Sequence, residues 1–144
     1  MKEDKIMTDV HVSALMQATP IAIKCKTQLS EVLEKLIEAK VSGLPVINNN
    51  NEVIGFVSGY DCHKALLASS YYCDKPIIVN DIMSNSVPTL SPSEGIGDVA
   101  IRVLDKMIDV YPVVENKKLV GTLTRNDILK VLNEKFAQCA VSNG

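Results

Sequence analysis

Two places in the sequence follow a Gly-x-x segment with a hydroxyl side chain and, three residues later, a carboxylate. Thr124 precedes Asp127, and Ser58 precedes Asp61. Each hydroxyl residue ends a short run that predicts a strand, and each carboxylate opens a predicted helix. A helix N-terminus exposes unpaired N–H groups and carries a partial positive charge, so each turn suits an anion such as phosphate.

The side chains at these turns could recognise both parts of a nucleotide. A Thr or Ser hydroxyl can donate a hydrogen bond to a phosphate oxygen, whereas an ionised aspartate only accepts hydrogen bonds. Asp127 and Asp61 therefore suit the two hydroxyls of a ribose 2′,3′-diol. Arg125 adds a cation at the second turn that could reach the phosphate.

The same pattern has a purely structural interpretation. Ser/Thr-x-x-Asp is also a capping box, in which the two side chains satisfy the first N–H groups of their own helix. A single occurrence would favour the capping box. Two occurrences at matching places of a repeat favour a binding site, with the capping box as the alternative.

The two turns belong to an internal repeat. Val12–Met16 resembles Val79–Met83, an offset of 83 − 16 = 67. The offset falls to 121 − 55 = 66 where Gly55 meets Gly121. This one-residue slip lies in a polar turn, where a duplicated fold tolerates a change of length.

Each copy predicts the same order of elements, β-α-β-β-α. The apolar positions of the first helix in each copy follow a one-faced helical period. Thr27 in the first copy, and Ser91 or Ser93 in the second, are expected to cap these helices. The first copy predicts strands 21–23, 44–47 and 53–57 with helices 29–41 and 61–67; the second predicts strands 87–90, 111–114 and 119–123 with helices 96–108 and 127–136.

These elements predict an α+β fold in which two repeats pack pseudo-symmetrically. A copy of about 55 residues is marginally stable alone, so the two copies should share their packing. The expected boundaries are an N-terminal extension 1–11, a first repeat 12–68, a connector 69–78, a second repeat 79–136 and a C-terminal tail 137–144.

The order of these motifs resembles the cystathionine β-synthase (CBS) domain family, and the tandem arrangement resembles a Bateman module. Val79–Met83 is similar to the family's opening signature, Val41–Val46 to its second-strand pattern, and segment 121–127 to its closing Gly-x-x-Thr-x-x-Asp motif. The resemblance implies a regulatory sensor that binds AMP, ADP, ATP, S-adenosylmethionine or a nicotinamide dinucleotide in clefts between the repeats. It also implies that two modules pair into a flat disc, a homodimer.

Carried over position by position, the resemblance implies two sites of unequal strength. The stronger second site would use Thr89, Tyr111 and Pro112 near the base, Thr124 and Arg125 at the phosphate, and Asp127 at the ribose. The weaker first site would use Leu44, Pro45, Ser58, Tyr60 and Asp61. Because Ala22 stands at the position of Thr89 and Gly59 at that of Arg125, we expect the second site to bind phosphorylated ligands better.

Composition and charge argue against several other classes of protein. A net charge of −2 disfavours a non-specific nucleic-acid binder, and 4% aromatic residues without Trp disfavour base stacking. No apolar run approaches the roughly 18 residues of a membrane span, and no secretory signal is apparent, so we expect a cytoplasmic protein. The 4 cysteines and 2 histidines form no metal-binding spacing, so we expect reduced thiols and no metal.

The sequence carries no nucleotide-hydrolase loop, serine-hydrolase elbow or zinc-protease motif, so we expect no catalysis and no required cofactor. An adenosine nucleotide would act as a regulatory ligand by favouring one orientation of the repeats. We expect no fused output domain, so a separate protein or a second copy would sense that orientation. The alternative is a ligand-free interaction or dimerisation module with vestigial nucleotide sites.

Overall fold

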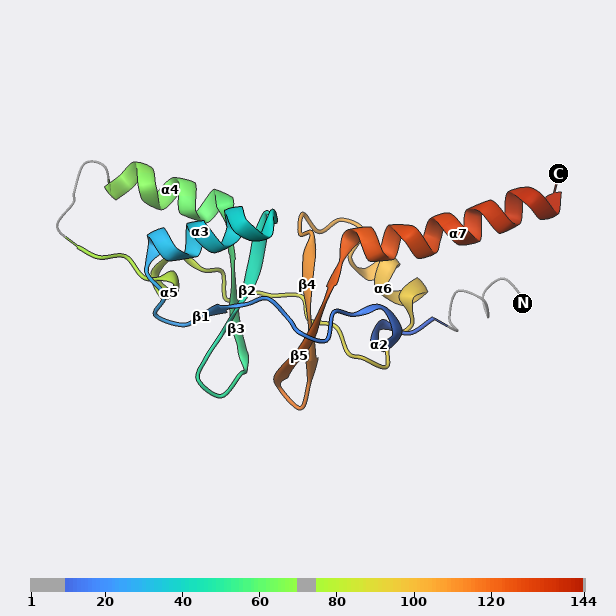
Figure 1. The fold of residues 1–144 in the computed structure, drawn as a ribbon, viewed down its shortest axis with the longest axis horizontal. Helices are drawn as coiled ribbons and strands as arrows, with labels where there is room; N and C mark the ends of the chain where they lie inside the picture. The colour runs from blue at the N-terminus through green and yellow to red at the C-terminus, as the bar shows by residue number, and fades with distance from the viewer. Residues whose placement is uncertain (1–9, 70–74, 144) are drawn as a thin grey trace.

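The computed structural model describes residues 10–69 and 75–143, with side chains described as far as residue 139. The first copy contains α2 (Val12–Leu15), β1 (Ile23–Lys24), α3 (Leu29–Ala39), β2 (Gly43–Ile47), β3 (Val53–Ser58) and α4 (Gly59–Ser69). The second contains α5 (Val79–Ile82), α6 (Ile96–Arg102), β4 (Val110–Glu115), β5 (Lys118–Thr124) and α7 (Arg125–Asn143). The expected α+β class is confirmed (Figure 1).

Each copy builds a small sheet around one hairpin. In the first copy β1 runs parallel to β2, which pairs with β3 in the antiparallel direction. In the second copy β4 and β5 pair alone, and the strand expected at 87–90 is reduced to one parallel bridge between Leu90 and Val113. That expectation was wrong: in the first copy the Cys25 N–H extends the pairing by donating to the Ile47 carbonyl, whereas the equivalent residue of the second copy is Pro92, which has no N–H.

The hairpins explain the one-residue slip in the repeat. Both carry a register shift at equivalent places, after Val46 in one and after Val113 in the other. The second hairpin closes through Asn116 and Lys117, both at positive φ, as a tight two-residue turn requires. The first closes through residues 48–52, so its extra length lies entirely in the turn.

The two first helices differ in length. α3 has 11 residues and ends in a left-handed cap at Lys40 (φ 57°). α6 has 7 residues and ends at Arg102, well short of the helix expected over 96–108. Gly97 and three β-branched residues, Val99, Ile101 and Val103, lower the helix propensity of this segment.

The expected hydroxyl caps of α3 and α6 are absent. The N-cap residues are Gln28 and Gly95, and neither side chain bonds to the helix. Thr27 instead donates to the Lys24 carbonyl at 2.6 Å. The first N–H group of each helix donates to a distant segment of the chain. The Leu29 N–H donates to the Ile77 carbonyl, and the Ile96 N–H donates to the Val10 carbonyl. Backbone pairing therefore replaces the side-chain caps.

Ser91 and Ser93 also find partners away from the start of α6. Their hydroxyls lie 3.1 Å from each other. The Glu94 carboxylate accepts the Ser91 N–H and forms an ion pair with Arg102 at 2.6 Å.

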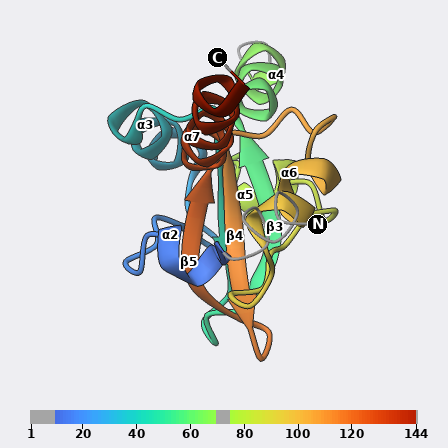
Figure 2. The same ribbon diagram turned by 90° about the vertical axis from the view of Figure 1, so that its right-hand side faces the viewer.

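The segments that lead each copy are exchanged between the two halves of the molecule. We call residues 10–17, which include α2, and residues 77–84, which include α5, the leading segments. Val12 packs in the core formed by the second copy, and Val79 packs in the core formed by the first. Gln17 bridges to Thr122, and Ser84 bridges to Phe56. Figures 1 and 2 show α2 beside β5, although the chain then runs on into β1.

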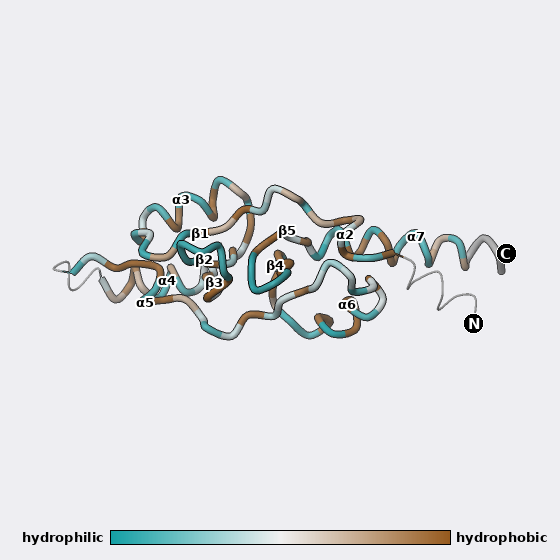
Figure 3. The backbone as a smooth tube through the Cα atoms, turned by 90° about the horizontal axis from the view of Figure 1, so that it is seen from below, coloured by the Kyte–Doolittle hydropathy of each residue, from teal (hydrophilic) through white to brown (hydrophobic). Residues whose placement is uncertain are grey.

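Each half thus has its own core beneath its helices. The first contains Ile23, Val32, Leu36, Leu44, Val46, Val57, Cys62, Val79 and Val110; the second contains Val12, Leu90, Ile96, Val99, Tyr111, Val113, Leu123, Ile128 and Val131. Val110 links the two halves, because it is the first residue of β4 in the second copy and its side chain packs in the first core. The trace in Figure 3 alternates between hydrophilic and hydrophobic along α7, in which Ile128 and Val131 pack in the second core while Leu129 and Phe136 are exposed.

Candidate functional site

The β5–α7 turn contains the second hydroxyl–carboxylate pair. The Thr124 N–H donates to Oδ2 of Asp127 at 3.0 Å, and the Asp127 N–H donates to Oγ1 of Thr124 at 3.1 Å. These reciprocal bonds are a capping box, so the structural interpretation of the motif describes this contact correctly. Oδ1 of Asp127 takes part in no hydrogen bond recorded for the described residues, which leaves one carboxylate oxygen as an acceptor.

The β3–α4 turn repeats this arrangement. The Ser58 N–H and hydroxyl both donate to Oδ2 of Asp61, each at 2.9 Å. The Asp61 N–H lies 3.2 Å from Oγ of Ser58. Oδ1 of Asp61 likewise accepts no hydrogen bond from any residue that the structure describes. Capping and ligand binding are compatible at both turns because capping uses one oxygen of two.

The two turns are joined through the interface between the halves. The Gly59 N–H donates to the Ser42 carbonyl at 2.8 Å, and the Arg125 N–H donates to the Asp109 carbonyl at 2.9 Å. Ser42 and Asp109 hold equivalent positions, and the Ser42 N–H donates to Oδ2 of Asp109 at 3.0 Å. The duplicated turns therefore begin on either side of one contact.

Asp109 is a residue of this interface that the sequence analysis missed. Its Oδ1 is inaccessible to solvent and has no hydrogen-bond partner within the described chain. The only signal in the sequence was its place opposite Ser42 in the repeat, since 109 − 42 = 67. A buried acceptor without a donor is costly, which marks this point of the interface as one that a donor could stabilise.

Arg125 lies against the chain rather than extending into open solvent. Its Nη2 donates to the Tyr111 hydroxyl at 2.9 Å and to the carbonyls of Val103 and Lys106. Its Nε donates to the Ile108 carbonyl at 3.4 Å. The guanidinium thus holds segment 103–109, which follows the shortened helix α6. The predicted contact between Arg125 and a phosphate stays a prediction.

The residues expected near the base are buried to different degrees. Tyr111 is fully buried in the second core, and burial raises the pKa of its hydroxyl, an effect that the Arg125 charge opposes. Pro112 is buried beside it, and Thr89 is exposed, with its carbonyl accepting from Arg102. Leu90 donates to the Pro112 carbonyl, which places Thr89 next to β4. The structure therefore brings Thr89, Tyr111 and Pro112 together.

The residues predicted for the first site lie at the equivalent places of the first copy. Leu44 and Pro45 are buried on β2, and Leu44 pairs with Val57, one residue before Ser58. Tyr60 is exposed on α4, where Lys64 lies 5.3 Å from its ring centre. Asp61 lines a cavity of about 270 Å³ together with Lys64, Ala65, Asp81 and Ile82.

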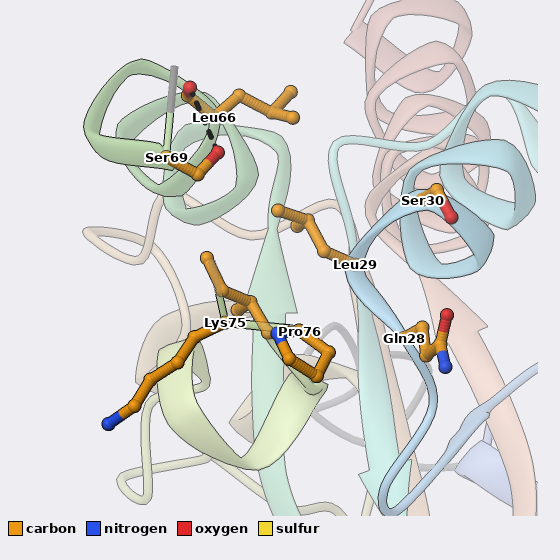
Figure 4. A pocket seen from close by; sticks show the side chains of 8 residues that line it. Gln28, Leu29, Ser30, Leu66, Ser69, Lys75 and Pro76 are labelled. Carbon is orange, nitrogen blue, oxygen red and sulfur yellow. Dashed lines mark hydrogen bonds between the residues drawn. The ribbon is translucent and has the colours of Figure 1, made fainter. Parts of the chain in front are cut away.

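A second cavity lies away from both turns. Its volume is about 310 Å³, and it is lined by the start of α3, the end of α4 and residues 75–77. Figure 4 shows Leu29 and Leu66 directed toward the space between these elements, with Lys75 extending away. Its lining includes none of the residues predicted to bind a ligand.

Comparison with known proteins identifies the fold and its duplication. The family model for the CBS domain matches residues 12–68 and again residues 79–134. The chain belongs to the CBS domain family. This CBS domain pair matches the uncharacterized protein MJ1225 of Methanocaldococcus jannaschii with 28% identity over 126 residues, which cover 88% of the chain and 44% of that protein. The chain spans less than half the length of this and the other first-ranked curated relatives.

Solved structures of other CBS domain pairs share the fold. The CBS domain pair of protein MJ0100, in complex with 5′-methylthioadenosine and S-adenosyl-L-methionine, matches with a TM-score of 0.73 and 25% identity, covering 88% of this chain and 98% of that one. CBSX2, a CBS-pair protein of Arabidopsis thaliana, was solved in complex with AMP. It matches with a TM-score of 0.72 and 30% identity over 86% of this chain and 96% of that one.

The described helices were also compared with the requirements of a membrane crossing. None of those in residues 10–69 and 75–143 has both the length and the apolar character that a crossing requires.

Proposed function

We propose that this CBS domain pair is a regulatory module that binds an adenosine nucleotide or S-adenosylmethionine-class ligand. The observation that carries the proposal is the duplicated turn: within the described chain, each leaves one aspartate oxygen without a hydrogen bond at the start of a helix, and the second also offers the Thr124 hydroxyl as a donor, whereas the Ser58 hydroxyl donates to Asp61. An aspartate oxygen there can accept from a ribose hydroxyl, while the helix N-terminus favours an anion. Two similar pairs that bind AMP, S-adenosylmethionine and methylthioadenosine support it.

The second site is proposed to take the phosphorylated ligand. Thr124 and Arg125 supply a hydroxyl and a cation at this turn, whereas the first turn has Ser58 and Gly59. Near the first turn, Asp61 lines a cavity with a second carboxylate, Asp81, and one ammonium group, Lys64, although the other residues predicted for the first site do not line it. This balance of charge suits a ligand with less negative charge.

Signalling would follow from the position of the two sites at one interface. A ligand that touches both halves stabilises the orientation in which it binds better. A second protein that reads this orientation would then sense the ligand, and neither step requires catalysis. Several longer relatives are named as enzymes, among them homoserine O-acetyltransferases. We propose that this chain corresponds to a non-catalytic part of such proteins.

A thermal-shift panel tests the proposal directly. Purified protein is melted with AMP, ADP, ATP, S-adenosylmethionine or NAD, with GMP as the control. A ligand at 100 times its Kd adds about 2.7 kcal/mol. That corresponds to roughly 5–10 °C in a domain of this size. A shift with an adenosine compound and none with GMP supports the proposal. A flat panel contradicts it.

A ligand-free dimerisation module is the second candidate. It is favoured by large apolar side chains that the helices leave exposed, including Ile37 on α3 and Phe136 on α7. Light scattering after size exclusion, with and without AMP, separates the two candidates. A dimer whose mass and melting temperature ignore every nucleotide would favour the second candidate.

A further inference from the structure

Arg125 has one observed role and one proposed role, and both draw on its guanidinium. The proposed function needs its charge at a ligand phosphate. In the structure the guanidinium instead holds segment 103–109, through the carbonyls of Val103, Lys106 and Ile108 and through the Tyr111 hydroxyl. These bonds use Nε and Nη2, so a bidentate contact with a phosphate at the second site, which takes two nitrogens of the guanidinium, would compete with these acceptors.

Segment 103–109 depends on this contact. It follows the shortened α6 and contains a turn but no further helix or strand. The equivalent segment of the first copy is helical as far as Ala39, and the residue equivalent to Arg125 there is Gly59, which has no side chain. The helix persists where the arginine is absent, and the irregular segment occurs where the arginine supplies donors to its carbonyls.

The segment also carries unusually exposed apolar groups. Leu104 is 77% exposed and Met107 is 96% exposed. A change in how the segment is held would therefore alter an apolar surface. That surface lies beside the start of α7, because Arg125 is the first residue of that helix.

We propose that Arg125 is a phosphate-operated latch: it holds segment 103–109 in the absence of ligand and releases it when a phosphorylated nucleotide takes the guanidinium at the second site. The inference rests on the proposed function and adds how the site is regulated. A phosphate attracts the guanidinium more strongly than neutral carbonyl and hydroxyl oxygens do, because charge-assisted bidentate bonds are stronger. A nucleoside without phosphate would bind and leave the latch closed.

Hydrogen exchange read by mass spectrometry tests the latch in the unmodified protein. AMP should speed exchange of amides in 103–109, whereas adenosine at equal site occupancy should not. Binding of AMP with unchanged exchange in this segment overturns the latch and leaves the proposed function standing. Failure of every adenosine compound to bind overturns the proposed function, and the latch with it.

The AMP affinity of the variant Tyr111→Phe is an independent test, because here the removal of a polar group is expected to increase the affinity. The change keeps the buried ring and removes one acceptor of the closed latch. AMP should therefore bind about two- to tenfold more tightly, the equivalent of one net hydrogen bond. Adenosine serves as the reference for any contact between Tyr111 and the base, so the ratio of AMP affinity to adenosine affinity should rise by the same factor. A loss of affinity for both ligands would instead make Tyr111 a direct ligand contact and contradict the latch.

Arg125→Ala completes the test, with Lys130→Ala as the control that removes a charge from the exposed side of the same helix. Without ligand, Arg125→Ala should already show fast exchange in 103–109, and AMP should add nothing. Lys130→Ala should behave like the unmodified protein. Slow exchange in ligand-free Arg125→Ala would show that the guanidinium does not hold the segment.

Discussion

Asp127 and Asp61 each serve their own helix with one carboxylate oxygen and leave the other oxygen uncommitted. A residue with this double role has two separable effects when it is replaced. The loss of a cap lowers the free energy of unfolding, and the loss of an acceptor lowers ligand affinity. A measurement that responds to both effects would attribute a loss of stability to a loss of ligand affinity.

Asp127→Ala is expected to weaken AMP binding about 10- to 100-fold, since hydrogen bonds to a charged group contribute roughly 1.5–3 kcal/mol. Loss of the capping box should also lower the free energy of unfolding by about 1 kcal/mol. Titration calorimetry well below the melting temperature isolates the affinity. Asp61→Ala should cost the same stability and less AMP affinity.

Asp98→Ala is the matched control, because Asp98 is an exposed aspartate in the first turn of α6. It should leave AMP affinity unchanged. Equal losses of affinity in Asp127→Ala and Asp61→Ala would contradict the ranking of the two sites.

The cysteines provide a prediction about pH. Burial, and to a smaller extent the Asp61 carboxylate, raises the pKa of the buried Cys62 thiol, so its thiolate forms only at higher pH than in a free cysteine. Cys139 is exposed. Peptide-resolved alkylation at pH 8 should label Cys139 within minutes and Cys62 only upon unfolding. Equal labelling in the native state would mean that the first core is open.

At the scale of elements, the leading segments fit against glycines of the opposite hairpin. A Cβ on Gly121 would lie 2.9 Å from the Gln17 carbonyl oxygen, and one on Gly55 would lie 2.9 Å from that of Ser84. Backbone cannot move away as a side-chain end can. These two glycines therefore set how closely each leading segment approaches its partner strand.

Gly121→Ala and Gly55→Ala should each lower the free energy of unfolding by about 1–3 kcal/mol through overpacking. Gly59→Ala is the control: its new Cβ would meet only the Ser42 carbonyl oxygen at 3.8 Å, in the first turn of α4. It should be neutral or stabilising by up to about 1 kcal/mol. Urea unfolding measures all three, and a neutral Gly121→Ala would mean that the leading segment is not held there.

The sequence predicted the elements well where periodicity and repetition act together. The order of elements in the first copy, both hairpins and the start of α3 follow from patterns that recur at a fixed offset. It failed where long-range backbone pairing decides the outcome. Thr27 and Ser91 have capping chemistry, yet the N–H groups they would serve are already paired with Ile77 and Val10. On the closing helix, Ile128, Val131 and Leu132 pack on the core, whereas Leu129 and Phe136 are exposed.

The candidate site, too, could be predicted from the sequence only in part. The sequence identified the residue types at both turns and the asymmetry between Arg125 and Gly59. It could not reveal that the guanidinium lies against segment 103–109, because that contact depends on where α6 ends. Nor could it reveal Asp109, whose buried oxygen is exceptional only once the two halves are packed.

At the scale of the whole molecule, exchange of the leading segments predicts one cooperative unfolding transition. Each core contains residues of both copies, so neither half can lose its packing alone. Calorimetry should give equal calorimetric and van't Hoff enthalpies. Two separated transitions, or a chain cut between the repeats whose halves fold independently, would contradict this expectation.

The exchanged leading segments also bear on how such a molecule could arise. A single copy of the repeat could cover Gly121 or Gly55 only with the leading segment of another molecule, so its folding would depend on protein concentration. Joining two copies in one chain makes the same contact intramolecular, at an effective concentration in the millimolar range for a short connection. Once that dependence is gone, each copy can diverge in sequence at its binding turn without losing its partner, as Arg125 and Gly59 have done.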